Sequence, residues 1–383
     1  MAGEPDGGYD QQPPNVVLPM TAMSRAAVFH GAGKPLELAT FPLPSLRSDE
    51  VLVEILCSTL CASDLHTYAG RRPAPVPSIL GHEIIGRVVA HGGTIGTFDD
   101  ARPLELGERI TWTVAASCGR CFYCRHELPQ KCETLFKYGH EPLERGCPLS
   151  GGLAEHCLLV EGTAILRVPA ELPEASAAPA NCATATVAAA LRYAHLRGGE
   201  SVLVQGAGML GLTACAMASR AGASAVMVGD VDAKRLERAA RFGATDTVLL
   251  AESSDALEQT VREQTAGRGV DVAFELSGSP AAIETGLGLL RTGGVYIWVG
   301  SVMPTRAISL SPETIVRRML RIHGVHNYAA ADLAVALRFL AETHTVYPFA
   351  ELVGTTYPLE AAEAAFAAAA RGDCLRVAVR PRP

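Results

Sequence analysis

The sequence predicts an α/β fold with two domains, one rich in β-strands and one built on a doubly wound parallel sheet. Three observations predict this class. The chain has 383 residues, which is too long for one ordinary core. Its first half consists of short apolar runs separated by Gly, Pro and Asp, a pattern typical of strands. From about residue 183, strand-like and helix-like segments alternate, as repeated β-α-β units require.

The β-rich half is expected from residue 25 to about residue 168. Its expected strands are 26–29, 51–56, 84–89, 109–114, 153–160 and 164–168. Mixed character returns near the C-terminus, with one further strand expected at 376–379. Residues 1–22 have neither the basic nor the apolar region of a signal peptide, so we expect a disordered tail there.

The alternating half is expected to hold five parallel strands and the helices between them. The expected strands are 201–205, 225–230, 247–250, 270–276 and 295–299. The expected helices are 209–221, 234–242, 256–265 and 280–290. An alanine-rich stretch at 175–194 is interrupted by Pro179, Asn181 and Arg192, which makes it unsuitable as a membrane span.

Composition excludes several classes of partner. With 48% hydrophobic and 19% charged residues the chain is expected to be globular, and its net charge of −7 favours neither nucleic acid nor an anionic membrane. The eleven cysteines are an odd number, and Cys215 lies within an apolar helical stretch where a disulfide is improbable. We therefore expect a reducing compartment, the cytoplasm, with some thiolates bound to metal.

A glycine-rich loop predicts a dinucleotide site. It follows the expected strand 201–205 directly and opens an apolar helix, the context that this weak motif needs. The loop consists of Gly206, Ala207, Gly208, Met209, Leu210 and Gly211. Its glycines permit a tight turn, close approach of a pyrophosphate, and close packing of helix on strand, while the helix N-terminus offers unpaired N–H groups to phosphate. The alternative is a structural glycine turn.

Asp230 predicts which dinucleotide is bound. It ends the next expected strand, 19 residues after Gly211, where a carboxylate binds the hydroxyls of the adenosine ribose. A 2′-phosphate would meet a negative charge there, so NAD is favoured over NADP. Arg235 lies nearby and can engage either cofactor.

A run of four cysteines predicts a closed zinc site. Cys118, Cys121, Cys124 and Cys132 have the spacing C-x2-C-x2-C-x7-C. Four thiolates complete a tetrahedron around Zn²⁺ and leave no open position for chemistry, so this site is structural. The alternative is four unrelated reduced thiols or two disulfides.

Three other residues predict a second, catalytic zinc. Cys61, His82 and Cys182 form a Cys₂His set, which leaves the fourth position of the metal open. Zn²⁺ at such a site makes a bound alcohol easier to deprotonate, and hydride can then pass to the nicotinamide. Taken alone, Cys182 is better explained as a small packed residue than as a ligand.

Together these motifs resemble the zinc-dependent alcohol dehydrogenases of the medium-chain dehydrogenase/reductase superfamily, over nearly all of residues 25–383. The resemblance implies a GroES-like β-barrel catalytic domain at 23–180 and 325–383, which contains the zinc lobe 118–132. It implies a Rossmann NAD-binding domain at 181–324. It also implies two zinc ions per chain and a homodimer or homotetramer.

The resemblance assigns roles to individual residues. Cys61, His82 and Cys182 would bind the catalytic zinc, with the Glu83 carboxylate beside it and Asp64 orienting His82. Ser63 would take the alcohol proton and pass it towards His66. Other residues would contact the cofactor: Thr186 the nicotinamide ring, Val299, Gly300 and Ser301 the carboxamide, and Arg376 the pyrophosphate. Ala62 departs from relatives that have a basic residue at this position, which leaves more phosphate charge to Arg376.

The substrate is predicted from three cationic or polar positions. By their spacing from the ligands, Arg72 and Lys137 match two positions of the family's substrate channel, and His140 lies near them in the sequence. Cations in a partly dehydrated pocket suit a phosphonate, phosphate or carboxylate. The segments 61–83 and 116–141 also resemble a subgroup associated with phosphonate metabolism, which implies a small hydroxyalkylphosphonate or its aldehyde. In the alternative, these side chains face solvent or pair with Glu141 and Glu144.

Three other functions are compatible with parts of this pattern. One is a dehydrogenase of an uncharged secondary or cyclic alcohol. A zinc-free enoyl or quinone reductase on the same scaffold would lack the three open-site ligands. A non-catalytic NAD-binding relative would not need Ser63 and His66.

Overall fold

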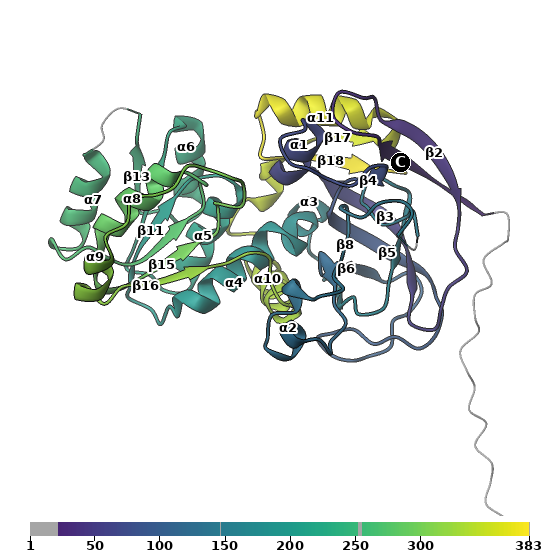
Figure 1. The fold of residues 1–383 in the computed structure, drawn as a ribbon, viewed down its shortest axis with the longest axis horizontal. Helices are drawn as coiled ribbons and strands as arrows, with labels where there is room; N and C mark the ends of the chain where they lie inside the picture. Colours follow the sequence, from purple (N-terminus) through teal and green to yellow (C-terminus); the bar gives the residue numbers. More distant parts are fainter. Residues whose placement is uncertain (1–21, 146, 252–254, 383) are drawn as a thin grey trace, which may run out of the picture.

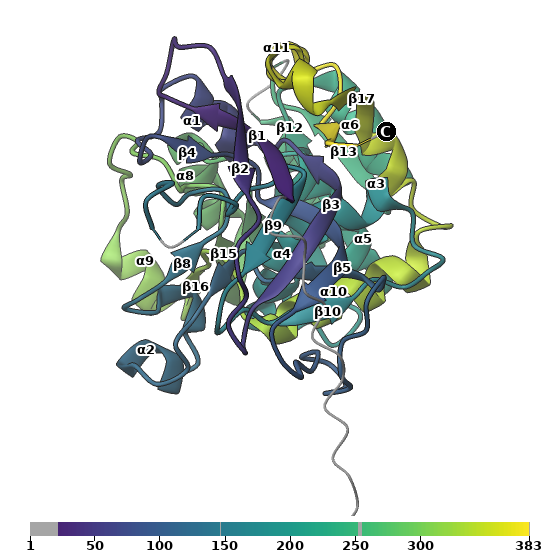
Figure 2. The same cartoon turned by 90° about the vertical axis from the view of Figure 1, so that its right-hand side faces the viewer.

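The computed structural model describes residues 22–145, 147–251 and 255–382. Two domains lie side by side, and the C-terminus lies in the same domain as the first strands (Figure 1; Figure 2 shows this domain from its own side). The predicted α/β fold class is confirmed. The predicted tail at 1–22 lies outside the described residues apart from Ala22, and the predicted domain boundaries stay a prediction.

The first domain is built on two sheets. The larger has the strand order β10-β6-β5-β3-β18-β17, with β9 also paired to β3, and the smaller has the order β2-β1-β4. Their strands are β1 (Met23–Phe29), β2 (Glu37–Pro42), β3 (Val51–Thr59), β4 (Ser78–Ile79), β5 (Glu83–His91), β6 (Arg109–Trp112), β9 (His156–Leu159), β10 (Ile165–Arg167), β17 (Val353–Pro358) and β18 (Arg376–Arg380). The short pair β7 (Ala115–Ala116) and β8 (Phe136–Lys137) flanks the cysteine run.

The second domain contains a six-stranded parallel sheet of order β13-β12-β11-β14-β15-β16. Its strands are β11 (Ser201–Gln205), β12 (Ala225–Asp230), β13 (Asp246–Leu249), β14 (Val270–Glu275), β15 (Leu290–Trp298) and β16 (Arg321–Gly324). The order reverses between β11 and β14, and ligands of such sheets bind at this switch point, outside the carboxyl ends of the strands.

Short helices connect these strands. The first domain has α1 (Ala62–Tyr68), α2 (Phe122–Arg125), α3 (Glu174–Ala177) and α11 (Ala362–Arg371). The others are α4 (Ala183–Ala194), α5 (Met209–Arg220), α6 (Ala233–Arg241), α7 (Ala256–Gln264), α8 (Pro280–Leu289), α9 (Pro312–Arg317) and α10 (Ala330–Thr343). The four predicted helices and five predicted parallel strands agree with these elements to within a few residues.

Some predicted strands differ from the observed ones. The strand expected at 153–160 is reduced to β9, because Leu153 and Ala154 face β1 instead: the Leu153 carbonyl accepts from Ala27 N at 2.8 Å. Apart from the two-residue strands β4, β7 and β8, the sequence pattern missed β2, β16 and β17, which all lie at sheet edges. These three strands are largely exposed, so they carry no continuous apolar run.

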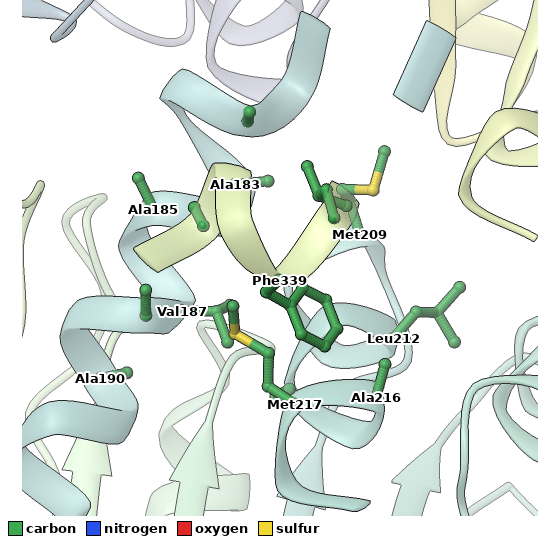
Figure 3. Close-up of a cluster of buried hydrophobic side chains, with 14 of the residues drawn as sticks. Ala183, Ala185, Val187, Ala190, Met209, Leu212, Ala216, Met217 and Phe339 are labelled. Carbon is green, nitrogen blue, oxygen red and sulfur yellow. The ribbon is translucent and has the colours of Figure 1, made fainter. Parts of the chain in front are cut away.

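Small side chains let three helices pack closely on one another. Helices α4, α5 and α10 pack around the Phe339 ring, which lies between Val187 of α4 and Leu212 of α5 (Figure 3). Ala183, Ala185 and Ala190 line this face of α4 and are fully buried. The alanine-rich stretch therefore belongs to a helix interface, and no helix in the described part of the chain is long and apolar enough to cross a membrane.

Candidate active site and metal-binding clusters

Three helix and strand ends bring the predicted catalytic ligands together. Cys61 follows β3 and begins α1, His82 immediately precedes β5, and Cys182 begins α4. The ligand atoms of Cys61, His82, Glu83 and Cys182 lie within 4.8 Å of one another. The Cys61 and Cys182 sulfurs are 4.0 Å apart, close to the separation of about 3.8 Å that two Zn–S bonds of about 2.3 Å give in a tetrahedron.

One thiol of this cluster, that of Cys61, is prepared to bind a cation, whereas the contact with the Cys61 sulfur raises the pKa of Cys182. The contact with the Cys182 sulfur, together with Arg376 and His82, holds the pKa of the buried Cys61 thiol well below its ordinary value. The thiolate, not the thiol, is the metal ligand. The donor set of two sulfurs, one imidazole and one carboxylate therefore suits Zn²⁺.

Asp64 orients the imidazole of His82. The His82 Nδ1 atom lies 3.1 Å from Asp64 Oδ1, and both side chains are buried. The other Asp64 oxygen accepts from Cys61 N at 2.9 Å, so one carboxylate fixes two of the ligands. This contact leaves Nε2 for the metal cluster, as a metal-bound histidine requires.

Glu83 pairs with Arg376 inside the protein. Arg376 Nε and Nη2 donate to the two Glu83 oxygens at 2.7 and 2.8 Å, and Thr59 Oγ1 donates to Glu83 Oε2 at 2.6 Å. Arg376 Nη2 also lies 3.5 Å from the Cys61 sulfur. Arg376 thus has a partner that the sequence analysis did not expect. Its proposed contact with pyrophosphate stays a prediction.

The four cysteines of the run form a second cluster, apart from the first. The Cys118 and Cys124 sulfurs are 4.0 Å apart and those of Cys121 and Cys132 are 3.9 Å apart. All four are free, so the alternative of two disulfides does not hold. Backbone N–H groups of Arg120 and Cys121 lower the pKa of Cys118 to about 6, which favours the thiolate form that binds zinc.

The glycine loop is shaped as a ligand cradle. Gly206 has φ 101°, which other residues rarely adopt, and a Cβ on Gly211 would lie 1.8 Å from Gly206 O. A Cβ on Gly208 would meet nothing within 4 Å, so the space in front of this residue is open. Open space at the start of a helix is where unpaired N–H groups bind phosphate in other proteins.

The Asp230 side chain, at the end of β12, holds the glycine loop by a hydrogen bond. Its Oδ2 accepts from Ala207 N at 2.6 Å and its Oδ1 accepts from Asp232 N at 2.9 Å. Arg235 lies at the edge of this carboxylate, with Nη1 3.9 Å from Oδ2. The predicted ribose-binding residue is therefore anchored to the predicted phosphate-binding loop.

A cavity of about 470 Å³ lies between the two domains and unites most of the predicted site. The three zinc ligands line it, together with Ser63, His66, Arg72, Lys137, His140, Thr186, Leu210, Val299, Gly300, Ser301 and Arg376. Glu83, Asp230, Arg235, Met209 and the three loop glycines lie outside its lining. The sequence analysis missed Ser277, Gly278, His326, Asn327 and Tyr328, which carry no motif and reach the cavity only through the fold.

Two cations of the cavity, Arg72 and Lys137, have no acidic partner among the described residues, whereas Arg376 pairs with Glu83. Arg72 Nη1 donates to His140 Nε2 at 3.1 Å, and His140 Nδ1 lies 2.9 Å from the Tyr138 carbonyl. Burial and the neighbouring Arg72 lower the pKa of Lys137. Glu141 pairs with Arg145 at 2.8 Å, so it does not neutralise the Lys137 ammonium.

Ser63 and His66 lie at the same cavity wall. Ser63 Oγ is 3.5 Å from His82 Nε2. The His66 ring is half-buried, and its Nδ1 accepts from Arg71 Nε at 3.0 Å. Burial and the Arg71 charge lower the pKa of His66, so the ring is neutral near pH 7.

Comparison with known proteins identifies the family. The alcohol dehydrogenase GroES-like domain family matches residues 47–170, and the zinc-binding dehydrogenase family matches residues 210–342. Sorbitol dehydrogenase of Bacillus subtilis is 31% identical over 93% of this chain and 97% of its own length. The chain belongs to the zinc-dependent alcohol dehydrogenases of the medium-chain dehydrogenase/reductase superfamily. It is an oxidoreductase, with zinc and a nicotinamide dinucleotide as cofactors.

Other relatives agree with this assignment. D-arabitol-phosphate dehydrogenase of Enterococcus avium is 28% identical over 89% of this chain and 92% of its own length. 5-exo-hydroxycamphor dehydrogenase of Pseudomonas putida is 30% identical over 82% of this chain and 87% of its own length. The crystal structure of an alcohol dehydrogenase from Thermotoga maritima superposes with a TM-score of 0.90 and 28% identity, covering 94% of this chain and 100% of that one.

Proposed function

We propose that the protein interconverts a small anionic alcohol and its aldehyde or ketone, with NAD as hydride acceptor and a phosphonate-bearing alcohol as the favoured substrate. One observation supports an anionic rather than an uncharged substrate. No Asp or Glu is among the described residues that line the cavity, whereas Arg72 and Lys137 do line it and have no acidic partner there. An acid group on the substrate would balance this positive charge.

The two cysteine clusters would hold two zinc ions per chain. Cys61, His82 and Cys182 would bind the catalytic ion, with the Glu83 carboxylate beside them, and the four cysteines of the run would bind the structural ion. A catalytic zinc makes the hydroxyl of a bound alcohol more acidic, and NAD accepts the hydride.

Ser63 and His66 would carry the alcohol proton away. Ser63 Oγ lies next to the ligand cluster and would accept the proton from the substrate hydroxyl. His66 would receive the proton at the cavity wall, where its lowered pKa keeps the ring neutral and able to accept. Since Arg71 donates to Nδ1, protonation at that atom requires this contact to open.

The cofactor would bind along the glycine loop and the cavity wall. Gly206, Gly208 and Gly211 would accommodate the pyrophosphate, and Asp230 the adenosine ribose. Thr186 and Val299–Ser301 line the cavity near the zinc ligands, which supports their proposed contacts with the nicotinamide. Arg376 would have only its Nη1 group left for phosphate, because Glu83 holds Nε and Nη2, and Nη1 itself already donates to the Leu375 carbonyl at 2.9 Å.

Replacing Asp230 with asparagine is expected to weaken the preference for NAD. The amide keeps an oxygen for Ala207 N but removes the charge that repels a 2′-phosphate. The ratio of kcat/KM with NAD to kcat/KM with NADP should fall about tenfold, which corresponds to about 1.4 kcal/mol. Steady-state kinetics with both cofactors measure this ratio. An unchanged ratio in D230N would contradict the proposed role.

The names of the relatives support two classes of substrate, an anionic alcohol and an uncharged one. One of them is, by its name, a dehydrogenase of a phosphate-bearing polyol, D-arabitol phosphate, which agrees with an anionic substrate. Others are, by their names, dehydrogenases of sorbitol and of 5-exo-hydroxycamphor. An uncharged secondary or cyclic alcohol is therefore the second candidate. The intact ligand cluster with Ser63 and His66 favours an enzyme over a non-catalytic NAD-binding relative.

Neutralising both cavity cations should separate the two candidates. The double variant Arg72→Gln, Lys137→Gln is expected to lower kcat/KM for 2-hydroxyethylphosphonate by more than about 100-fold, because each charge-assisted contact contributes roughly 1.5–3 kcal/mol. For an uncharged alcohol of similar size the change should stay within about threefold. Paired steady-state kinetics measure both values.

The control for this variant is Arg87→Gln, which removes an exposed cation of β5 that does not line the cavity. It should leave both substrates unaffected. Equal kcat/KM for 2-hydroxyethylphosphonate and the uncharged alcohol in the wild-type protein would overturn the anionic substrate in favour of the second candidate.

We further propose a cytoplasmic homodimer or homotetramer. All eleven cysteines are free, which supports a reducing compartment. The edge strand β16 is adjacent in sequence to α9, and this region exposes Val316 and Met319 by 75% and 73%. Exposed apolar side chains beside an open sheet edge support association with a second copy.

A further inference from the structure

Glu275 is a buried carboxylate that the proposed mechanism does not use. It ends β14 at the switch point of the parallel sheet and has no exposed surface. Every other buried carboxylate that the structure describes lies within 4.0 Å of an Arg or His nitrogen: Glu50, Asp64, Glu83, Glu141, Glu155, Asp230 and Asp332. No such ion pair involves Glu275 within the described ranges, so its charge needs another explanation.

The hydrogen bonds of Glu275 point to the cofactor end of the cavity. Its Oε1 accepts from Ser277 N at 2.7 Å, Ser277 Oγ at 2.8 Å and Gly278 N at 2.6 Å. Its Oε2 accepts from Ser301 Oγ at 3.4 Å. A carboxyl group that only accepts hydrogen bonds shows the pattern of the ionised form.

Glu275 also fixes the neighbouring loop through its backbone. Its carbonyl oxygen accepts from Val299 N and Gly300 N, both at 3.0 Å. The two segments that it holds, 276–278 and 299–301, line the cavity. The carboxylate therefore lies one layer behind the wall that is proposed to contact the nicotinamide.

We propose that Glu275 is a positioning residue for the nicotinamide end of the cofactor and that its fixed negative charge favours the oxidised form. This inference rests on the proposed NAD-linked function. Oxidised nicotinamide carries a positive charge and reduced nicotinamide is neutral. A buried charge acts strongly over short distances because little water screens it, so it lowers the free energy of the cationic ring relative to the neutral ring.

Glu275→Gln tests the charge with little change of shape. The amide oxygen can still accept from Ser277 N and Gly278 N, and its NH₂ group can donate to Ser301 Oγ. Binding of NAD⁺ should weaken about tenfold relative to binding of NADH, because the attraction between the buried negative charge and the cationic ring is lost. Calorimetric titration gives the two dissociation constants without any substrate.

The matched control is Asp271→Asn, which removes a charge from the opposite end of the same strand. Asp271 pairs with Arg291 at 2.6 Å and does not line the cavity. In this variant the ratio of the two dissociation constants should equal that of the wild-type protein.

Glu275→Asp separates charge from geometry, and it decides the question alone if Glu275→Gln fails to fold. The aspartate keeps the charge but cannot reach all four donors, so both cofactor forms should bind more weakly. The ratio of their two dissociation constants should equal that of the wild-type protein. A tenfold change of ratio in Glu275→Asp, or an unchanged ratio in folded Glu275→Gln, would overturn the inference. Failure of the wild-type protein to bind NAD⁺ or NADH would instead contradict the proposed function itself.

Discussion

Replacing Cys61 with serine is expected to lower kcat with any alcohol by about 10³-fold or more. The variant removes one of three ligands from the proposed catalytic zinc site, and this metal contributes several kcal/mol of transition-state stabilisation. Serine is nearly isosteric, so the fold should be retained. The loss should appear in kcat with every substrate, because it does not depend on the acid group that Arg72 and Lys137 would bind.

Cys57→Ser is the matched control for this prediction. Cys57 is a buried thiol of β3, four residues before Cys61, and lies outside both metal clusters. Its substitution should leave kcat within about threefold of the wild-type value. Comparable kcat values for Cys61→Ser and Cys57→Ser would contradict the assignment of Cys61 as a ligand.

Replacing Arg376 with methionine is expected to destabilise the protein by about 3–5 kcal/mol, the range for a buried ion pair that loses one partner. Arg376 is 6% exposed and Glu83 is fully buried, so removing the guanidinium leaves the Glu83 carboxylate uncompensated. Chemical denaturation of the zinc-loaded protein measures the change as a lower midpoint.

The double variant Arg376→Met, Glu83→Gln provides the control. Removing the charge of Glu83 should recover most of the lost stability, because the uncompensated carboxylate is the main cause of the loss. A destabilisation below about 1 kcal/mol in Arg376→Met would contradict a tightly paired buried guanidinium.

Local patterns predicted the parts of the site that are encoded by short segments. The glycine loop needs a strand before it and a helix after it, and β11 and α5 provide both. The cysteine run lies within 15 residues, so its spacing alone indicates one metal. The Rossmann strands are buried on both faces, which makes their apolar runs easy to recognise.

Contacts between residues far apart in the chain could not be predicted from local sequence patterns. Arg376 and Glu83 are 293 residues apart, and only the pairing of β18 with β3 brings the C-terminal strand to the ligand cluster. The contacts of Glu275 could not be predicted for the same reason, because its partner Ser301 lies on another loop. Its burial without a cation is a property of the folded sheet, and no residue pattern encodes it.

The zinc content of the wild-type protein and of Cys61→Ala, measured side by side by elemental analysis, tests the central claim most directly. The ligand sets predict about two zinc ions per chain in the wild-type protein and about one in the variant, because the cluster of Cys118, Cys121, Cys124 and Cys132 stays intact. A single zinc ion per chain that Cys61→Ala leaves unchanged would contradict the catalytic metal site.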